Sequence, residues 1–151
     1  MEKTEDFIIN RLTWKASQYK IPTDYSFYFN DLTIDIKNYL CNQFDQNIAG
    51  TPVLFFTKPT KQWTLICTKQ VICNDNEKII KLNLSDIEQF HPTVVKDYRT
   101  QRTNLQEVQK SEWDKVDVTD KENRNYTFHA FKGADLFAMW NILLMAARLY
   151  D

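Results

Sequence analysis

Two histidines and three cysteines are the side chains of this chain that could hold a transition metal. They are His91, His129, Cys41, Cys67 and Cys73, and no two of them have the close spacing of a zinc knuckle. Cys67 and Cys73 are an even number of residues apart, so on one unbroken strand they would share a face. Free cysteine is among the most buried residue types. We therefore expect core positions for both thiols and no metal site.

A cysteine nucleophile is the second chemistry that these residues allow. Cys67 or Cys73 could pair with His129 if the fold brought their strands together. We expect His129 to be solvated or hydrogen-bonded, on the strand face opposite Phe128. The sequence shows no nucleophile elbow, no glycine-rich oxyanion turn and no helix start behind either cysteine. With two glycines in the chain, a phosphate-cradling loop is also unsupported. We expect a non-enzymatic protein without a cofactor, with a cysteine-dependent enzyme as the unfavoured alternative.

Aromatic side chains give a stronger functional indication than the histidines and cysteines. The stretch DYSFYF places four rings in six residues, and Trp63 adds a fifth ring in a later strand. A dense run of this kind is difficult to bury on both of its faces in one small core, and exposed Tyr and Phe clusters are typical of interface centres. The alternative is that N-terminal helices close over the rings. The candidate partner-binding residues are Tyr25, Phe27, Tyr28, Phe29 and Trp63.

Helices at both ends of the chain enclose a run of strands. Apolar residues recur at helical spacing after Thr4, up to about Lys20, and a second helix should follow Asn30 or Asp31. Strands are expected over 53–57, 63–75 and 79–87, followed by a hairpin over 116–130. The final helix begins at 133–135. Segregated helices and strands indicate a single α+β domain, in which the conformation of residues 92–112 is not determined by the pattern.

The final helix is apolar on nearly all sides. Its longest uninterrupted apolar run, 142–147, is too short to cross a bilayer, and Asn141 and Arg148 interrupt the longer segment. A lysine-rich polar face, typical of helices that lie on membranes, is absent. We therefore expect this helix to pack against the sheet, with Trp140 in its core and the N-terminal helices on its other side.

Residues 51–150 resemble a bacterial pleckstrin-homology-like (PH-like) domain. The resemblance rests on the basic first hairpin VLFFTKPTKQWTLICTKQVIC, on the strand EKIIKLNLSDIEQF and on the strand and helix NYTFHAFKGADLFAMWNILLMAARL. It implies a small barrel closed by the last helix, with residues 1–48 as a helical appendage. Some members of the family bind phosphoinositides through the first hairpin, and the matching residues here are Lys58, Lys61 and Lys69. The arginine that usually completes the basic cluster is missing, and many members bind proteins instead.

Charge and composition limit the classes of partner that this chain could bind. The net charge is -1, with 19 basic and 20 acidic residues, so a nucleic-acid surface is not expected. An acidic start and an odd number of cysteines indicate a cytoplasmic protein with reduced thiols. We expect a bacterial protein-binding module, such as an immunity protein that neutralises a toxin or a signalling adaptor. The alternative is a PH-like module that binds anionic lipid at a membrane surface.

Overall fold

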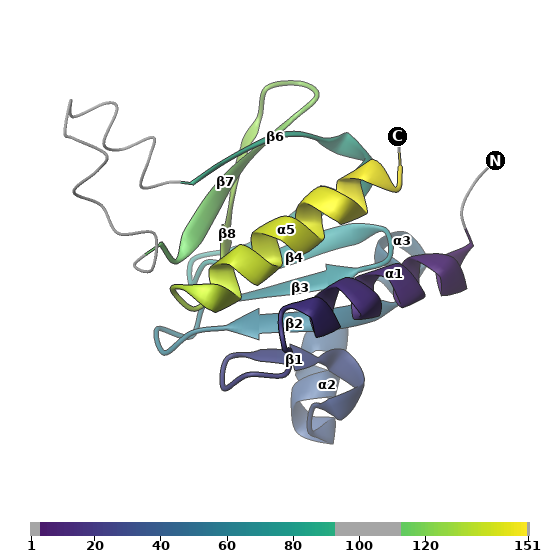
Figure 1. The fold of residues 1–151 in the computed structure, drawn as a ribbon, viewed down its shortest axis with the longest axis vertical. Helices are drawn as coiled ribbons and strands as arrows, with labels where there is room; N and C mark the ends of the chain where they lie inside the picture. Colours follow the sequence, from purple (N-terminus) through teal and green to yellow (C-terminus); the bar gives the residue numbers. More distant parts are fainter. Residues whose placement is uncertain (1–3, 93–112, 151) are drawn as a thin grey trace.

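The computed structural model describes residues 4–92 and 113–150 (Figure 1). The helices of this part of the chain are α1 (Glu5–Gln18), α2 (Ile34–Cys41), α3 (Gln46–Ala49) and α5 (Ala134–Arg148), with 3-10 turns η1 (Phe29–Asp31) and η2 (Leu84–Asp86). The strands are β1 (Ser26–Tyr28), β2 (Pro52–Thr57), β3 (Trp63–Cys67), β4 (Gln70–Asn74), β5 (Ile79–Asn83), β6 (Ile87–Pro92), β7 (Lys115–Asp120) and β8 (Asn125–His129). The sequence pattern did not determine the conformation of residues 92–112. Pro92 ends β6, and the rest of this segment lies outside the described residues.

Two antiparallel sheets make up the strand part of the fold, which is α+β as expected. One sheet has the order β1-β2-β3-β4-β5 and the other the order β6-β7-β8. Helices α1 and α5 lie side by side across one face of the larger sheet (Figure 1). Side chains of α2 and α3 pack on its other face. The sheets share no strand ladder in the described part of the chain, so the small closed barrel implied by the resemblance is not formed.

The N-terminal helix forms as its sequence predicts. The Thr4 side chain accepts a hydrogen bond from the Phe7 backbone N–H, which caps the first turn of α1. Ile8, Leu12 and Ala16, spaced by four residues, are buried. The start of the second helix was predicted wrongly. Asn30 and Asp31 lie in η1, and Thr33 caps α2 instead.

The expected long strand over 63–75 is in fact a hairpin. The chain bends at Thr68 and Lys69, and β3 pairs with β4 from Trp63–Asn74 to Ile66–Val71. Cys67 and Cys73 consequently lie in different clusters, one on each face of the sheet. The unbroken strand on which they would share a face is not formed, although both are buried as expected. Strands β1 and β6 were also not anticipated.

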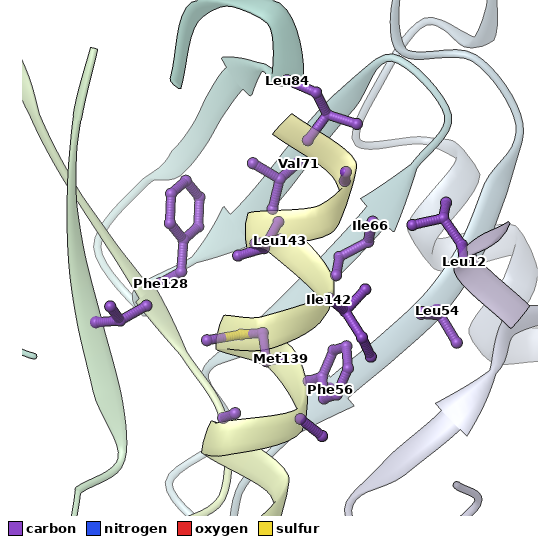
Figure 2. Packing of buried hydrophobic residues seen from close by; sticks show 14 of the residues in the cluster. Leu12, Leu54, Phe56, Ile66, Val71, Leu84, Phe128, Met139, Ile142 and Leu143 are labelled. Carbon is purple, nitrogen blue, oxygen red and sulfur yellow. The ribbon is translucent and has the colours of Figure 1, made fainter. Parts of the chain in front are cut away.

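Two hydrophobic clusters enclose the larger sheet. In Figure 2, Met139, Ile142 and Leu143 of α5 pack among Phe56, Ile66, Val71 and Phe128. The second cluster lies on the other face and includes Leu40 of α2 and Ala49 of α3. Because both faces are covered, β2, β3 and β4 are buried along nearly their whole length.

Trp140 of the last helix is not in the centre of the core. Trp140 is half-buried, and its ring stacks on Phe137, with 6.2 Å between the ring centroids. Trp113 lies 6.4 Å away and completes a cluster at the margin of the core. The core-facing side of α5 is formed instead by Leu136, Met139 and Ile142 with their neighbours.

Within residues 4–92 and 113–150, no helix combines the length and the hydropathy needed to cross a membrane. The last helix has 15 residues, a length of about 22 Å at 1.5 Å per residue, against a hydrocarbon layer of about 30 Å.

Candidate functional site

Most of the aromatic side chains at residues 25–29 are packed inside the fold. β1 pairs with β2, and successive side chains point to opposite faces of the sheet. Tyr28 packs against the cluster under α5, whereas Phe27 and Phe29 join the cluster under α2. Tyr25 stacks on Phe131 with 4.1 Å between the ring centroids. The sheet has a core on each face, and the argument that the rings exceed one core therefore does not hold.

Trp63, the fifth candidate ring, is also buried. It lies in β3, only 5% exposed, and Tyr39 of α2 meets it edge to face at 6.2 Å. The contact matters because Tyr39 is itself 47% exposed. The structure thus places Trp63 directly beneath a side chain that is accessible from solvent.

The three lysines of the lipid hypothesis do not form one cluster. The Lys58 ammonium group is buried and lies 3.1 Å from a carboxylate oxygen of Asp114. Burial lowers the pKa of Lys58, and the neighbouring Asp114 opposes this effect. Lys61 and Lys69 are exposed, but they flank opposite ends of β3, about 16 Å of strand at 3.3 Å per residue. No common headgroup site is formed by these residues.

The Cys73 thiol meets the backbone of His129, rather than its imidazole, in a buried junction between the two sheets. The Thr64 hydroxyl donates to the His129 carbonyl at 2.7 Å and accepts from the His129 backbone N–H at 3.0 Å. His129 is 6% exposed rather than solvated. Its Nδ1 atom is buried without a hydrogen-bond partner among the described residues. Sequence reasoning missed this burial because Phe128 occupies the other face of the same strand.

The electrostatics of this junction oppose a thiolate–imidazolium pair. Burial raises the pKa of Cys73 to about 11, which hydrogen bonds involving Thr64 and the His129 backbone only partly offset. Burial also lowers the pKa of His129 to about 4, assisted by the nearby charges of Lys58 and Lys115. A nucleophilic cysteine requires a thiolate. At neutral pH the Cys73 thiol and the His129 imidazole are therefore both neutral.

The other cysteines have different surroundings. Burial raises the pKa of Cys67 far above its ordinary value, and Cys41 on α2 is exposed. Among residues 4–92 and 113–150, no three histidine, cysteine, aspartate or glutamate side chains are grouped closely enough to hold a metal ion.

The most exposed large apolar side chains of α2 and α3 form the candidate partner surface. These side chains, called the α2–α3 surface below, are Ile34 (68% exposed), Ile48 (59%), Tyr39 (47%) and Ile36 (40%). In α2, only Leu40 is buried against the sheet. Helical spacing alone would place Ile36 and Tyr39 with Leu40 on one packed face, but both are largely exposed. Ile34 is the first residue of α2 after its cap Thr33, and Ile48 lies in the first turn of α3 after its cap Asp45. An isoleucine in the first turn of a short helix is the sequence signal that could have revealed both.

A groove lies at the other end of the molecule, between β6 and α5. Its volume is about 700 Å³. Apolar parts of the lining come from Ile87, Phe90, Trp140, Leu144 and Ala147, and polar parts from Glu88, Gln89, Lys121 and Arg148. The sequence pattern did not indicate a groove here, because β6 was not predicted as a strand.

Comparison with known proteins finds no matching family model, no matching curated protein and no matching solved structure.

Proposed function

We propose that this chain is a protein-binding module and that the α2–α3 surface is its main contact with a folded partner. The supporting observation is the exposure of three isoleucines and a tyrosine on two short helices. Isoleucine usually faces the interior of a protein, and exposed large apolar side chains are frequent at interaction sites. Tyr39 adds an aromatic side chain of the kind that dominates interface energies, and the buried Trp63 holds its ring from below.

The surface can supply a useful part of a binding free energy. Complete burial of an isoleucine is worth about 1.5–3 kcal/mol. Ile34 and Ile48 retain more than half of their surface in solvent, so a partner that covers them gains about 1–2 kcal/mol from each side chain. The loss of both contacts should weaken binding by roughly 30-fold or more.

The partner class that we propose is a cytoplasmic protein, either a toxin that this chain neutralises as an immunity protein or a component of a signalling assembly. The order of elements supports a PH-like binding module: four antiparallel strands β2–β5, three strands β6–β8 and the closing helix α5. Residues 5–49 then form an addition that carries the α2–α3 surface. PH-like folds serve several kinds of binding, so the surface carries the proposal and the fold supports it.

The test is a comparison of matched baits in a lysate of the source organism. The baits are the wild type, the double variant Ile34→Ser with Ile48→Ser, and Leu144→Ser, which alters the groove instead. We expect one stoichiometric partner on the wild type and on Leu144→Ser, and at least tenfold less on the double variant. Equal recovery on all three baits, or no stoichiometric partner on the wild type, would refute the proposal.

Co-expression then separates the two partner classes. The captured protein is expressed alone and together with each variant, and growth is followed. A toxin would arrest growth, and the wild type but not the double variant would restore it. A signalling component would leave growth unchanged in every combination.

A further inference from the structure

The groove between β6 and α5 combines a strand edge with an apolar lining. β6 is an edge strand, because in the described part of the chain it pairs only with β7. An edge strand presents unpaired backbone N–H and C=O groups that another chain can use. In Figure 1, β6 and the C-terminal end of α5 approach each other. Phe90 of β6 and Leu144 of α5 contribute to the same hollow.

The charges of the groove are unbalanced. Its lining contains the cations Lys121 and Arg148 and the single acid Glu88. Neither cation forms an ion pair with any described residue, whereas Lys58 and Arg124 elsewhere pair with Asp114 and Asp120. Two cations that form no ion pair among the described residues, beside an apolar lining, match a ligand that carries carboxylates together with an apolar side chain.

We propose that this groove is a second binding site, which takes an extended peptide segment containing acidic residues. The segment adds, through main-chain hydrogen bonds, to the edge of β6 that has no partner strand in the described part of the chain. One apolar side chain of the peptide enters the hollow between Phe90 and Leu144, and its carboxylates lie near Lys121 and Arg148. A strand of six residues such as β6 can pair along about 20 Å of peptide. This site lies apart from the α2–α3 surface and does not depend on its function.

A phage-displayed library of random twelve-residue peptides provides the probe. We expect selection on the wild type to enrich peptides in which acidic and apolar residues alternate. The enriched pool should bind the double variant Ile34→Ser with Ile48→Ser as well as the wild type, which separates this site from the α2–α3 surface. Binding should fall at least tenfold for Leu144→Glu. The double variant Lys121→Glu with Arg148→Glu, which changes two exposed side chains, should instead select basic peptides.

Backbone methylation of the most enriched peptide tests the strand addition itself. In an added strand only every second peptide N–H faces β6, so N-methylation should reduce affinity at least tenfold at alternate positions and little at the positions between. Uniform tolerance of methylation would refute strand addition. Failure to enrich any peptide, or equal binding of the pool to the charge-reversed variant, would overturn the site as a whole.

Discussion

Acid should destabilise this protein through one buried side chain, His129. The imidazole is 6% exposed at the junction between the two sheets, with Nδ1 unpaired among the described residues. Burial is the main cause that lowers its pKa from 6.5 to about 4, followed by the charges of Lys58 and Lys115. Asp114 and Asp75 act in the opposite direction and do not compensate. Protonation therefore requires a second positive charge to enter a site that already holds the Lys58 ammonium group.

The sign and the size follow from proton linkage. Between pH 6.5 and pH 4 the unfolded chain binds a proton that the native state does not, so stability falls as the pH falls through this range. The pKa difference, 6.5 minus about 4, corresponds to about 3 kcal/mol at 1.36 kcal/mol per unit, of which about 2 kcal/mol is already lost at pH 5. That loss is a large part of the 5–15 kcal/mol typical of a small domain. The strongly hydrogen-bonded carboxylate of Asp120, whose pKa is lowered to about 2, loses its contribution only at more acidic pH.

The assay is urea unfolding at several pH values between 7.5 and 4.5, for the His91→Gln protein and for His91→Gln with His129→Gln. The shared His91→Gln change leaves His129 as the single histidine. We expect the free energy of unfolding of the first protein to fall by about 2 kcal/mol more than that of the second between pH 7.5 and pH 5. Parallel curves for the two proteins would show that the native imidazole protonates freely, and the burial argument would then be wrong.

Three further outcomes follow from the packing. Asp135→Ala should destabilise the protein by about 2–4 kcal/mol in urea unfolding, because Asp135 accepts hydrogen bonds from Thr23, at 2.6 Å, and from the buried Ser26; a loss below 0.5 kcal/mol would contradict this role. Met139→Ala should lower the free energy of unfolding by about 2–5 kcal/mol, because this side chain of α5 is fully buried. Ile34→Ala, at an exposed position, should lower it by less than 1 kcal/mol, and similar losses in both variants would contradict the assigned burial. A thiol reagent at neutral pH should label only Cys41 in the native protein and all three cysteines in guanidinium, since Cys67 and Cys73 are buried with raised pKa values; rapid labelling of Cys73 would instead support the enzyme alternative.

The spacing of apolar residues was sufficient to predict those helices and strands that bury only one of their faces. The spacing of Ile8, Leu12 and Ala16 predicts α1 correctly, and the alternation around Val116 and Phe128 predicts the β7–β8 hairpin. It was insufficient for the β3–β4 hairpin. Both faces of these strands are buried, so Leu65, Ile66 and Cys67 follow one another without alternation up to a bend at Thr68, where neither glycine nor proline marks the turn.

The candidate sites were less predictable, because their exposure depends on tertiary packing. Whether Tyr25 or Ile34 faces solvent depends on which cluster lies under its element, and the chain builds two clusters where one was assumed. The same assumption led to the prediction that some rings of residues 25–29 would be left exposed. Lys58 shows the problem for charges, because the position expected in a basic hairpin turn is occupied by a buried ammonium paired with Asp114, 56 residues later.

The position of α5 at the end of the described chain has a consequence for synthesis on the ribosome. The sheet face formed by Leu54, Phe56, Ile66 and Val71 is covered by α1 and by side chains from residues 136–146 (Figure 2). About 70 residues must therefore emerge after β4 before this face can be fully covered, several seconds or more at ordinary elongation rates. A nascent chain stalled in that interval would expose apolar strands to its neighbours, which makes early binding by a chaperone an expected step in its biogenesis.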